Sequence, residues 1–402
     1  MVSVIVSILE PDFYKEFHCV AGACRNSCCV YPWNISIDKA NYKKLRDLKQ
    51  PKWLTDNLGQ YIKRTPDNKP EEYAQVVFKE HGCAFQTEEG LCRLQAELGE
   101  GYLSHTCRTY PRLASFMKGD INYRECCLST SCEEVARMLL HKQEPILFES
   151  RTEKLPLATF QANMFTYSNM LHQEDRPILT HYHLIRSICI AVLQNREYSI
   201  EQRLALLMIY LDKLAAAEQN ETTNDIPHLT DVFVSAVDEH LYDSLFEQKT
   251  GAKPAVVLGN IASVYAFGKC TNDAIIKRCD AGIANIPYPQ RMENYHRFIS
   301  DKEYFLEHLL VNELFGDCLP FKTGYSILEN AQFLASIFSI LRFMLGGYIG
   351  NNNTLTEVEI LDFISFFGKT VLHSSASFTN NIDLLKRADM NTLPALITLI
   401  LG

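Results

Sequence analysis

Cysteines gather in the first third of the chain, and the densest group places four thiols within eleven residues, from Cys19 to Cys29. Ten of the fourteen cysteines precede residue 133, whereas the remaining four are widely separated. Thiolates bind zinc in groups of four and also hold iron–sulfur clusters. Soft sulfur ligands at this density therefore predict a metal or iron–sulfur centre rather than a set of inert core cysteines.

The cysteine spacing disfavours two familiar sites. A zinc ribbon usually shows two Cys-x2-Cys pairs, and this sequence has none. The spacing Cys24-x3-Cys28 begins the radical S-adenosylmethionine pattern, but Tyr31 stands where its third cysteine is expected. Adjacent Cys28 and Cys29 cannot easily bind the same iron corner. One of them is therefore expected to serve a second site, to pack in the core or to belong to a redox pair.

Other side chains near these cysteines have two interpretations each. His81 and His105 lie within two residues of a cysteine and could bind metal or hydrogen-bond a sulfur, although a polar loop histidine is the commoner case. Arg108 and Arg112 could donate hydrogen bonds to cluster sulfurs or a carboxylate, or could simply be solvated. The glycines at 99 and 101 lack the remainder of a dinucleotide motif, and no phosphate-binding loop is present.

The bulk composition is that of a globular protein. The chain has 402 residues, 47% apolar and 22% charged, which suits two domains. A net charge of −9 without a dense basic run predicts no nucleic-acid partner, so a protein partner is expected. The N-terminal apolar run lacks a positive segment and a cleavage site, which predicts a cytoplasmic location. Clustered thiols in that reducing compartment indicate metal or redox chemistry rather than disulfides.

The elements that must position the thiols fall into two regions. Residues 1–141 mix short strands, hairpins and turns and form the predicted cysteine-rich metal domain. Residues 142–402 show helical periodicity and form a predicted all-helical domain of nine or ten helices, so the fold class is mainly α. The apolar segment 331–350 is expected to be a buried core helix rather than a membrane span. Peripheral membrane contact through it or through Leu393 to Leu401 stays open.

Several local features are predicted within these regions. Trp33 to Asp38 alternates like a short strand, and Asp38 is expected to cap a helix through Leu48. A turn at Glu89-Gly90 should bring Cys83 and Cys92 together in a short hairpin. A helical turn is expected from Leu94 to Leu98, and a strand near Met117 to Arg124. Capping boxes are predicted at Ser199 with Gln202 and at Thr354 with Glu357.

Four cysteine-bearing blocks follow one another along the chain: FHCVAGACRNSCC with WNISIDK, GCAF with GLCRL, LSHTCRTYPR, and LSTSCEEVARMLL. These ordered blocks resemble the flagellin lysine-N-methylase family, whose N-terminal part is similar to CxxxCxxCC-type cysteine-rich metal-binding proteins. The helical segments HLIRSICIAVLQNREYSIEQRLALLMIYL and YFLEHLLVNELFGDCLPF also resemble segments of that family. The resemblance covers most of the chain, and its cysteine blocks are more specific than its helices.

The resemblance implies S-adenosylmethionine-dependent methylation of the ε-amino group of lysines on flagellin in the bacterial cytoplasm. It also implies a [4Fe-4S] cluster in the cysteine-rich part, with zinc as the alternative metal. The candidate ligands carried over are Cys19, Cys24, Cys28, Cys29, Cys83, Cys92, Cys107 and Cys132. Cys126 and Cys127 fall outside the family pattern. Eight candidates are a surplus for one four-sulfur cluster, so either two centres exist or only half of the thiols bind.

Two classes of function follow. The first is a protein-lysine methyltransferase, which must remove the proton of an amine of pKa near ~10.4 and align nitrogen with the methyl group. Its catalytic base is not identified by the sequence, and its donor pocket is expected between the two domains. The second is a non-catalytic iron–sulfur or zinc module for electron transfer or protein interaction. The absence of a recognisable methyl-donor motif favours the second.

Overall fold

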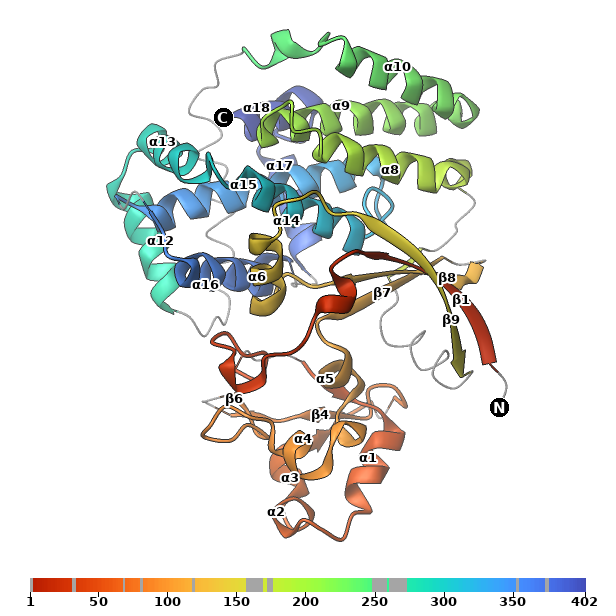
Figure 1. Cartoon of the computed structure of the whole chain (residues 1–402), viewed down its shortest axis with the longest axis vertical. Coiled ribbons are helices and arrows are strands. Elements are labelled where there is room, and N and C mark those ends of the chain that lie inside the picture. Colours follow the sequence, from red (N-terminus) through yellow and green to blue (C-terminus); the bar gives the residue numbers. More distant parts are fainter. Residues whose placement is uncertain are drawn as a thin grey trace.

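The computed structural model describes residues 3–30, 34–67, 69–79, 82–117, 120–156, 169–171, 176–247, 259, 273–351, 354–372 and 376–402. Within these ranges the chain forms a large upper lobe, built of a sheet and a group of helices, and a small lower lobe made of residues 34–107 (Figure 1). The N-terminal segment begins in the sheet of the upper lobe and descends to the small lobe (Figure 1).

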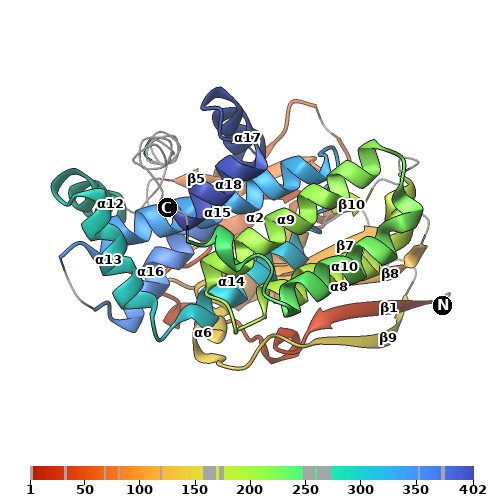
Figure 2. The same ribbon diagram turned by 90° about the horizontal axis from the view of Figure 1, so that it is seen from above.

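A five-stranded sheet forms one side of the upper lobe, in the order β10-β7-β8-β1-β9. Strand β1 pairs in parallel with β8 and in antiparallel with β9 over its whole length, and Figure 2 shows β1 and β9 side by side. Strands β7 and β8 form an antiparallel hairpin. The strand bounds are β1 Ser3–Pro11, β7 Arg112–Met117, β8 Asp120–Leu128, β9 Phe148–Pro156 and β10 Asn169–Leu171.

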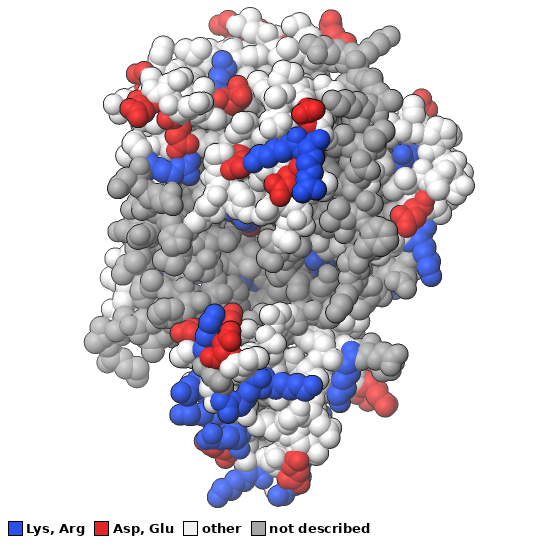
Figure 3. Space-filling view, turned by 180° about the vertical axis from the view of Figure 1, so that it is seen from behind, with Lys and Arg blue, Asp and Glu red and all other residues white. Residues whose placement is uncertain are grey.

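The small lobe consists of short elements around a core of its own. That core contains eight buried apolar side chains, which are Ile37, Leu45, Leu54, Ile62, Ala74, Phe85, Leu94 and Leu103. Its strands are β2 Ser36–Ile37, β3 Ile62–Arg64, β4 Ala74–Val76, β5 Phe78–Lys79 and β6 Gly82–Cys83. Its helices are α1 Lys39–Arg46, α2 Lys52–Thr55, α3 Leu58–Tyr61, α4 Arg93–Leu98 and α5 His105–Thr109. Lys and Arg side chains gather on one face of this lobe (Figure 3).

Helices fill the rest of the upper lobe. Helix α6, Glu133–His141, follows the β7–β8 hairpin and packs against α14 and α16. The later helices are α8 Tyr182–Leu193, α9 Ile200–Gln219, α10 Ile226–Asp238, α12 Asp273–Asn285, α13 Tyr288–Ile299, α14 Glu303–Gly316, α15 Ile327–Ile349, α16 Glu357–Phe367, α17 Ser377–Arg387 and α18 Leu393–Leu401. The mainly helical class with a strand-bearing, cysteine-rich N-terminal part is thereby confirmed.

Helix α15 runs through the centre of the helical group and contacts α9, α12, α13, α17 and α18 (Figures 1 and 2). It is long and apolar enough to cross a membrane, yet that apolar stretch is wholly buried inside the protein. At its crossing with α12, a Cβ on Gly282 would overlap the carbonyl oxygen of Gly347, so glycine permits this close approach. The segment is therefore a core helix, as expected.

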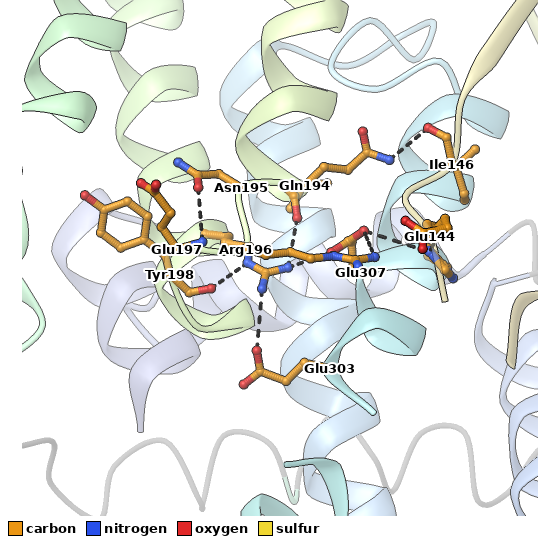
Figure 4. Close-up of polar contacts among 12 residues, drawn as sticks. Glu144, Ile146, Gln194, Asn195, Arg196, Glu197, Tyr198, Glu303 and Glu307 are labelled. Atoms are coloured by element: carbon orange, nitrogen blue, oxygen red, sulfur yellow. Dashed lines mark hydrogen bonds and ion pairs between the residues drawn. The ribbon is translucent and has the colours of Figure 1, made fainter. Parts of the chain in front are cut away.

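A buried ion network joins the α8–α9 corner to α14. The Glu307 carboxylate, fully buried, accepts hydrogen bonds from Arg196 Nε at 2.8 Å and Nη2 at 2.9 Å (Figure 4). Arg203 Nη1 donates to the same carboxylate at 2.8 Å. Because the buried Arg203 and the exposed Arg196 share this one carboxylate, its desolvation is offset by charge-assisted hydrogen bonds.

Most of the predicted local features are confirmed. Asp38 caps α1 by accepting from the N–H groups of Ala40 and Asn41, and Ser199 with Gln202 forms the capping box of α9. Helix α4 lies where a helical turn was expected. The predicted strand near Met117 to Arg124 is confirmed only in part, because β7 ends at Met117 and β8 begins at Asp120. Strand β2 covers Ser36 and Ile37, whereas Trp33 lies outside the described residues.

Two expectations need correction or extension. The second capping box is formed by Thr356 and Glu359, not by Thr354 and Glu357, since overlapping Thr-x-x-Glu patterns lie two residues apart. Strand β9 lies beyond residue 142, where only helices were expected, because its pairing with distant β1 is not visible locally. The division into 1–141 and 142–402 stays a prediction.

Candidate metal centre

Cys29 and Cys83, far apart in the sequence, are held together by their backbones. The N–H of Cys83 donates a hydrogen bond of 2.7 Å to the carbonyl oxygen of Cys29. Gly82 lies in the left-handed region at φ +120°, and a Cβ there would be 2.6 Å from that same oxygen. Only glycine fits this position without displacing the backbone.

The predicted hairpin brings Cys92 to the same place. An antiparallel bridge joins Gln86 with Cys92, and the N–H of Arg93 donates to the carbonyl of Phe85 at 2.8 Å. Cys107 comes from α5, where its N–H donates to the capping Ser104 Oγ at 3.1 Å. The helix cap and the hairpin turn are both made by residues close in the sequence, so Cys92 and Cys107 are positioned by local interactions.

The thiols of Cys29, Cys83, Cys92 and Cys107 are mutual neighbours, and, in addition to burial, Cys29 raises the pKa of each of the other three. Burial raises the pKa of Cys83 to about 12, and the thiols of the other three add to the effect. Burial also raises the pKa of Cys107 to about 11, with contributions from Cys29 and Cys92. The pKa of Cys92 is raised mainly by burial and further by Cys29. Metal binding would have to displace the protons that these thiols retain.

Cys28 and Cys29 form a hydrogen-bonded pair. The bond from the Cys28 thiol lowers the pKa of Cys29 to about 7, and the same bond is the largest cause that raises the pKa of Cys28. Cys28 is also close to Cys107 and Cys132, both of which raise its pKa further. Cys29 is therefore the thiol of this group that ionises most readily, as a metal-binding thiolate must.

A second group of thiols lies between the loop of residues 19–28 and the start of α6. Asn26 joins the two, since its N–H and its Nδ2 donate to Glu133 Oε2 at 2.8 and 3.0 Å. Cys132 precedes Glu133 as the N-cap residue of α6. Burial raises the pKa of Cys24 to about 12, with further contributions from Glu133 and Cys132.

A buried cation from the helical part lies beside this second group. Lys369, buried in the π-helical turn Gly368–Leu372, donates from Nζ to the carbonyl of Asn26 at 2.6 Å. Burial lowers the pKa of Lys369, while Cys24, Cys28, Cys132 and Glu133 act in the opposite direction. Its ammonium is thus positioned to offset negative charge on these thiols.

The eight predicted ligands are therefore brought into one region. Figure 1 shows the N-terminal segment passing between α6 and the small lobe. All cysteines in the described part of the chain are free thiols. Cys19, Cys28 and Cys107 are exposed as whole residues, although the thiols of Cys28 and Cys107 point inward and are largely buried, and the other five residues are half-buried. The number and softness of the donors fit tetrathiolate metal or iron–sulfur sites. The cysteine side chains lie in one region but do not form a coordination site, because no three metal-binding side chains among the described residues are arranged around a common point.

Other predicted residues lie at or outside this region. Arg108 Nη2 and His105 Nδ1 are 3.3 Å apart, and Arg112 Nη2 donates to the carbonyl of Phe17 at 3.2 Å. His81 lies outside the described residues. Cys126 and Cys127 are buried on β8, where burial raises the pKa of Cys126 to about 12, and neither joins the eight thiols.

Sequence reasoning missed an open cavity of about 420 Å³ between the N-terminal segment and α6. Its apolar lining residues are Phe13 and Met138, and the others are charged or titratable: Asp12, Glu16, Glu134, Arg137, His141 and Lys142. Asp12 Oδ2 accepts from Lys142 at 2.7 Å, whereas Asp12 Oδ1 is buried and has no hydrogen-bond partner among the described residues. The two apolar side chains can contact an aliphatic stem and the carboxylates a cationic end, while Arg137 and Lys142 add positive charge to the same walls.

Comparison with known proteins identifies relatives of this chain. The family described as "FliB lysine N-methylase C-terminal domain" matches residues 186–399. Proteins named "Lysine-N-methylase" from Salmonella typhimurium and Salmonella choleraesuis are each 28% identical over 195 residues, 46% of this chain and 48% of the relative. A "Flagellar biosynthetic protein FliU" from Salmonella muenchen is 30% identical over 136 residues, 34% of this chain and 78% of the relative. The chain thus spans about half the length of the first two. No solved structure matches significantly.

Proposed function

The chain belongs to the FliB lysine N-methylase family, and we propose that it transfers a methyl group from S-adenosylmethionine to the ε-amino group of lysines on flagellin. The match to the family over residues 186–399, which covers α9 to α17 in full, carries this proposal. The names of the relatives, lysine-N-methylase and flagellar biosynthetic protein, agree in pointing to a flagellar lysine substrate. The reaction is assigned to the bacterial cytoplasm, where flagellin is present before export.

We further propose an iron–sulfur centre of the [4Fe-4S] kind in the cysteine-rich part. Its support is the gathering of the eight thiols and the buried Lys369 beside three of them. When bound, such a centre would supply either a Lewis-acidic iron or an electron. Zinc is the alternative metal, because the same thiols suit a tetrathiolate site.

The cavity beside α6 is the proposed entry point of the substrate lysine. Phe13 and Met138 offer apolar contact for the four-carbon stem, and the orphaned Oδ1 of Asp12 can accept a hydrogen bond from the ammonium. The amine must then lose its proton before it can attack, since an ordinary lysine is protonated at neutral pH. A carboxylate that holds the nitrogen in place contributes mainly orientation and proton acceptance.

Label transfer tests the proposal directly. Anaerobically prepared full chain, incubated with methyl-labelled S-adenosylmethionine and flagellin, is expected to place label on flagellin lysines, which peptide mass spectrometry can locate. Flagellin whose lysines are chemically acetylated is the matched control and should remain unlabelled. Failure of transfer by protein with intact metal would contradict the proposed activity.

A non-catalytic metal or electron-transfer module is the second candidate. One observation favours it: Cys19, Cys28 and Cys107 are exposed residues, which places their part of the chain at the surface, as in an electron-transfer or docking protein. Calorimetric titration with S-adenosylmethionine separates the two candidates, because a simple metal carrier should show no saturable binding of the methyl donor.

A further inference from the structure

The last turn of α6 places a histidine at the cavity in which the substrate lysine is proposed to bind. His141 lines this cavity together with Asp12, and the next residue, Lys142, forms the 2.7 Å ion pair with Asp12 Oδ2. His141 and the orphaned Oδ1 of Asp12 therefore border the same space, although they come from different segments of the chain. The His141 side chain is 57% exposed, so a substrate and solvent can both reach its ring.

A carboxylate from another helix holds this ring. Glu357 Oε2, in the first turn of α16, lies 3.2 Å from His141 Nε2. Glu357 Oε1 accepts a hydrogen bond of 2.5 Å from Arg137 Nη1, one turn earlier on α6. The hydrogen bond with His141, followed by the charges of His141 and Arg137, lowers the pKa of Glu357, so this carboxylate is ionised at neutral pH.

The contact with Glu357 leaves the other ring nitrogen available. A carboxylate that accepts from one nitrogen of a neutral imidazole keeps the hydrogen on that side of the ring, so the second nitrogen can accept a proton. His141 Nδ1 forms no hydrogen bond within the part of the chain that the structure describes. An exposed histidine held by a buried or paired carboxylate at a cavity is an arrangement that general bases use.

The charges around His141 suit an ammonium group. Both cations of the cavity walls already have carboxylate partners, since Arg137 binds Glu357 and two glutamates of its own helix, and Lys142 binds Asp12. The carboxylates of the lining outnumber these cations, and they are Asp12, Glu16 and Glu134. The two cations nevertheless ease the loss of a proton from a bound ammonium, because a neighbouring like charge disfavours the charged form.

We propose that His141 is the catalytic base that removes the proton from the substrate lysine, and that Glu357 is the positioning residue that holds its ring. This inference deepens the proposed methyl transfer and rests on it. Imidazole suits the step because it exchanges a proton near neutral pH. Asp12 Oδ1 then holds the lysine nitrogen in place while His141 takes the proton.

The reaction can be written with its atoms and charges balanced. The lysine ammonium gives one proton to His141 Nδ1, and the nitrogen lone pair forms a bond to the methyl carbon of S-adenosylmethionine. The bond from that carbon to sulfur breaks, and S-adenosylhomocysteine leaves with its electron pair. The nitrogen becomes a methylammonium, and His141 returns its proton to solvent through the exposed side of the ring.

The pH dependence of methyl transfer tests the role of His141. Single-turnover label transfer to flagellin is followed from about pH 6 to about pH 10, the range in which imidazole and lysine lose their protons. At neutral pH, His141→Asn should lower the rate about 10²- to 10⁴-fold, the usual contribution of a general base. The rate should recover toward pH ~10.4, where lysine loses its proton unaided. Added imidazole should restore part of it at neutral pH, which a misfolded variant would not allow.

Two further variants complete the test. His228→Asn, an exposed histidine on α10, is the matched control and should keep the full rate. Glu357→Gln retains an oxygen that can accept from the ring but removes the charge that favours a protonated imidazole. The acid limb of its pH profile should therefore move to lower pH, a change that a merely structural role would not produce.

The outcomes separate this assignment from the proposed function. An unchanged rate and pH profile in His141→Asn would overturn the assignment and leave the methyltransferase activity intact. A loss of rate that neither high pH nor imidazole restores would also overturn it, because the residue would then be needed for something other than proton removal. Absence of transfer by the unaltered chain would contradict the proposed function, and the assignment with it.

Discussion

The amide of Cys83 donates a 2.7 Å hydrogen bond to the carbonyl oxygen of Cys29, and this bond fixes the distance between two candidate ligands that are far apart in the sequence. The residue that makes it feasible is Gly82, whose missing side chain leaves room for the Cys29 carbonyl. The first four-thiol group therefore depends on a glycine as well as on its cysteines.

Replacing Gly82 by alanine should separate these two backbones. A Cβ 2.6 Å from an oxygen, at a φ of +120°, is expected to cost about 1–3 kcal/mol of stability. Chemical denaturation measures this loss, and metal analysis should show that metal binding by Cys29 and Cys83 is weakened. Gly59→Ala is the control, since nothing lies within 4 Å of a Cβ there. Equal behaviour of the two variants would show that the close approach is unimportant.

Lys369→Met should weaken metal binding by the thiols beside it. The substitution removes a buried cation that donates to Asn26 and lies beside Cys24, Cys28 and Cys132. Loss of such an outer partner typically lowers metal affinity about 10- to 100-fold. A timed chelator challenge should therefore remove metal from the variant sooner than from the unaltered chain. Lys386→Met, which removes an ion pair with Glu329, is expected to leave the time course unchanged.

Glu307→Ala should destabilise the helical part strongly. Its carboxylate is shared by Arg196 and Arg203, and the side chain of Arg203 is only 3% exposed. Removing the acceptor leaves a buried cation without its main partner, which costs about 3–5 kcal/mol. Urea denaturation measures this change in the free energy of unfolding. Glu303→Ala removes a longer contact of 3.5 Å from a half-buried site and should cost less than about 1 kcal/mol. Similar losses of stability from Glu307→Ala and Glu303→Ala would show that the shared carboxylate of Glu307 has no special role.

Glu359 provides a pH-dependent contribution to stability. The hydrogen bond from Arg278, followed by the N–H of Thr356, lowers the pKa of Glu359 to about 2, below its value of ~4.3 in an unfolded chain. The unfolded state therefore binds more protons between these values, so the contribution is complete above about pH 4.3 and is lost as the pH falls toward 2.

The variant Glu359→Gln keeps a side chain that can cap Thr356 but removes the charge. At neutral pH it should be less stable by about 1 kcal/mol, a figure reduced for solvent screening because the carboxylate is 31% exposed. The difference from the unaltered chain should vanish near pH 2 to 3, within the window set by the shifted pKa of about 2. A difference that persists there would mean that packing, not charge, is responsible.

The features read correctly from the sequence are those with local causes. Asp38 and Ser199 cap helices through bonds to residues two or three positions away, and the Cys83–Cys92 hairpin closes on its own turn. Where two local patterns overlap, as at Thr354 and Thr356, the sequence alone did not decide which one caps the helix.

The features that escaped prediction depend on contacts between distant residues. Strand β9 exists because β1, far away in the sequence, pairs with it. The cysteine set was predicted from density and resemblance, but the contacts of Asn26 with Glu133 and of Lys369 with Asn26, which tie the cysteine-bearing loop to the helices, were not. The spacing of apolar residues along the chain does not indicate contacts between residues that are distant in the sequence. The cavity was missed for the same reason, since its walls come from two separate segments.

Asp12→Asn should impair methyl transfer while preserving the shape of the cavity. If Asp12 Oδ1 accepts a hydrogen bond from the substrate ammonium, the loss of this charge-assisted bond costs about 1.5–3 kcal/mol, or ~10- to ~100-fold in kcat/KM. Steady-state methylation of flagellin measures the effect. Lys142→Gln is the matched control because it breaks the same 2.7 Å ion pair but leaves the carboxylate in place, so its effect should be smaller. Equal losses from both variants would show that the ion pair, not the free oxygen, matters for activity, and the substrate lysine would then have to enter elsewhere.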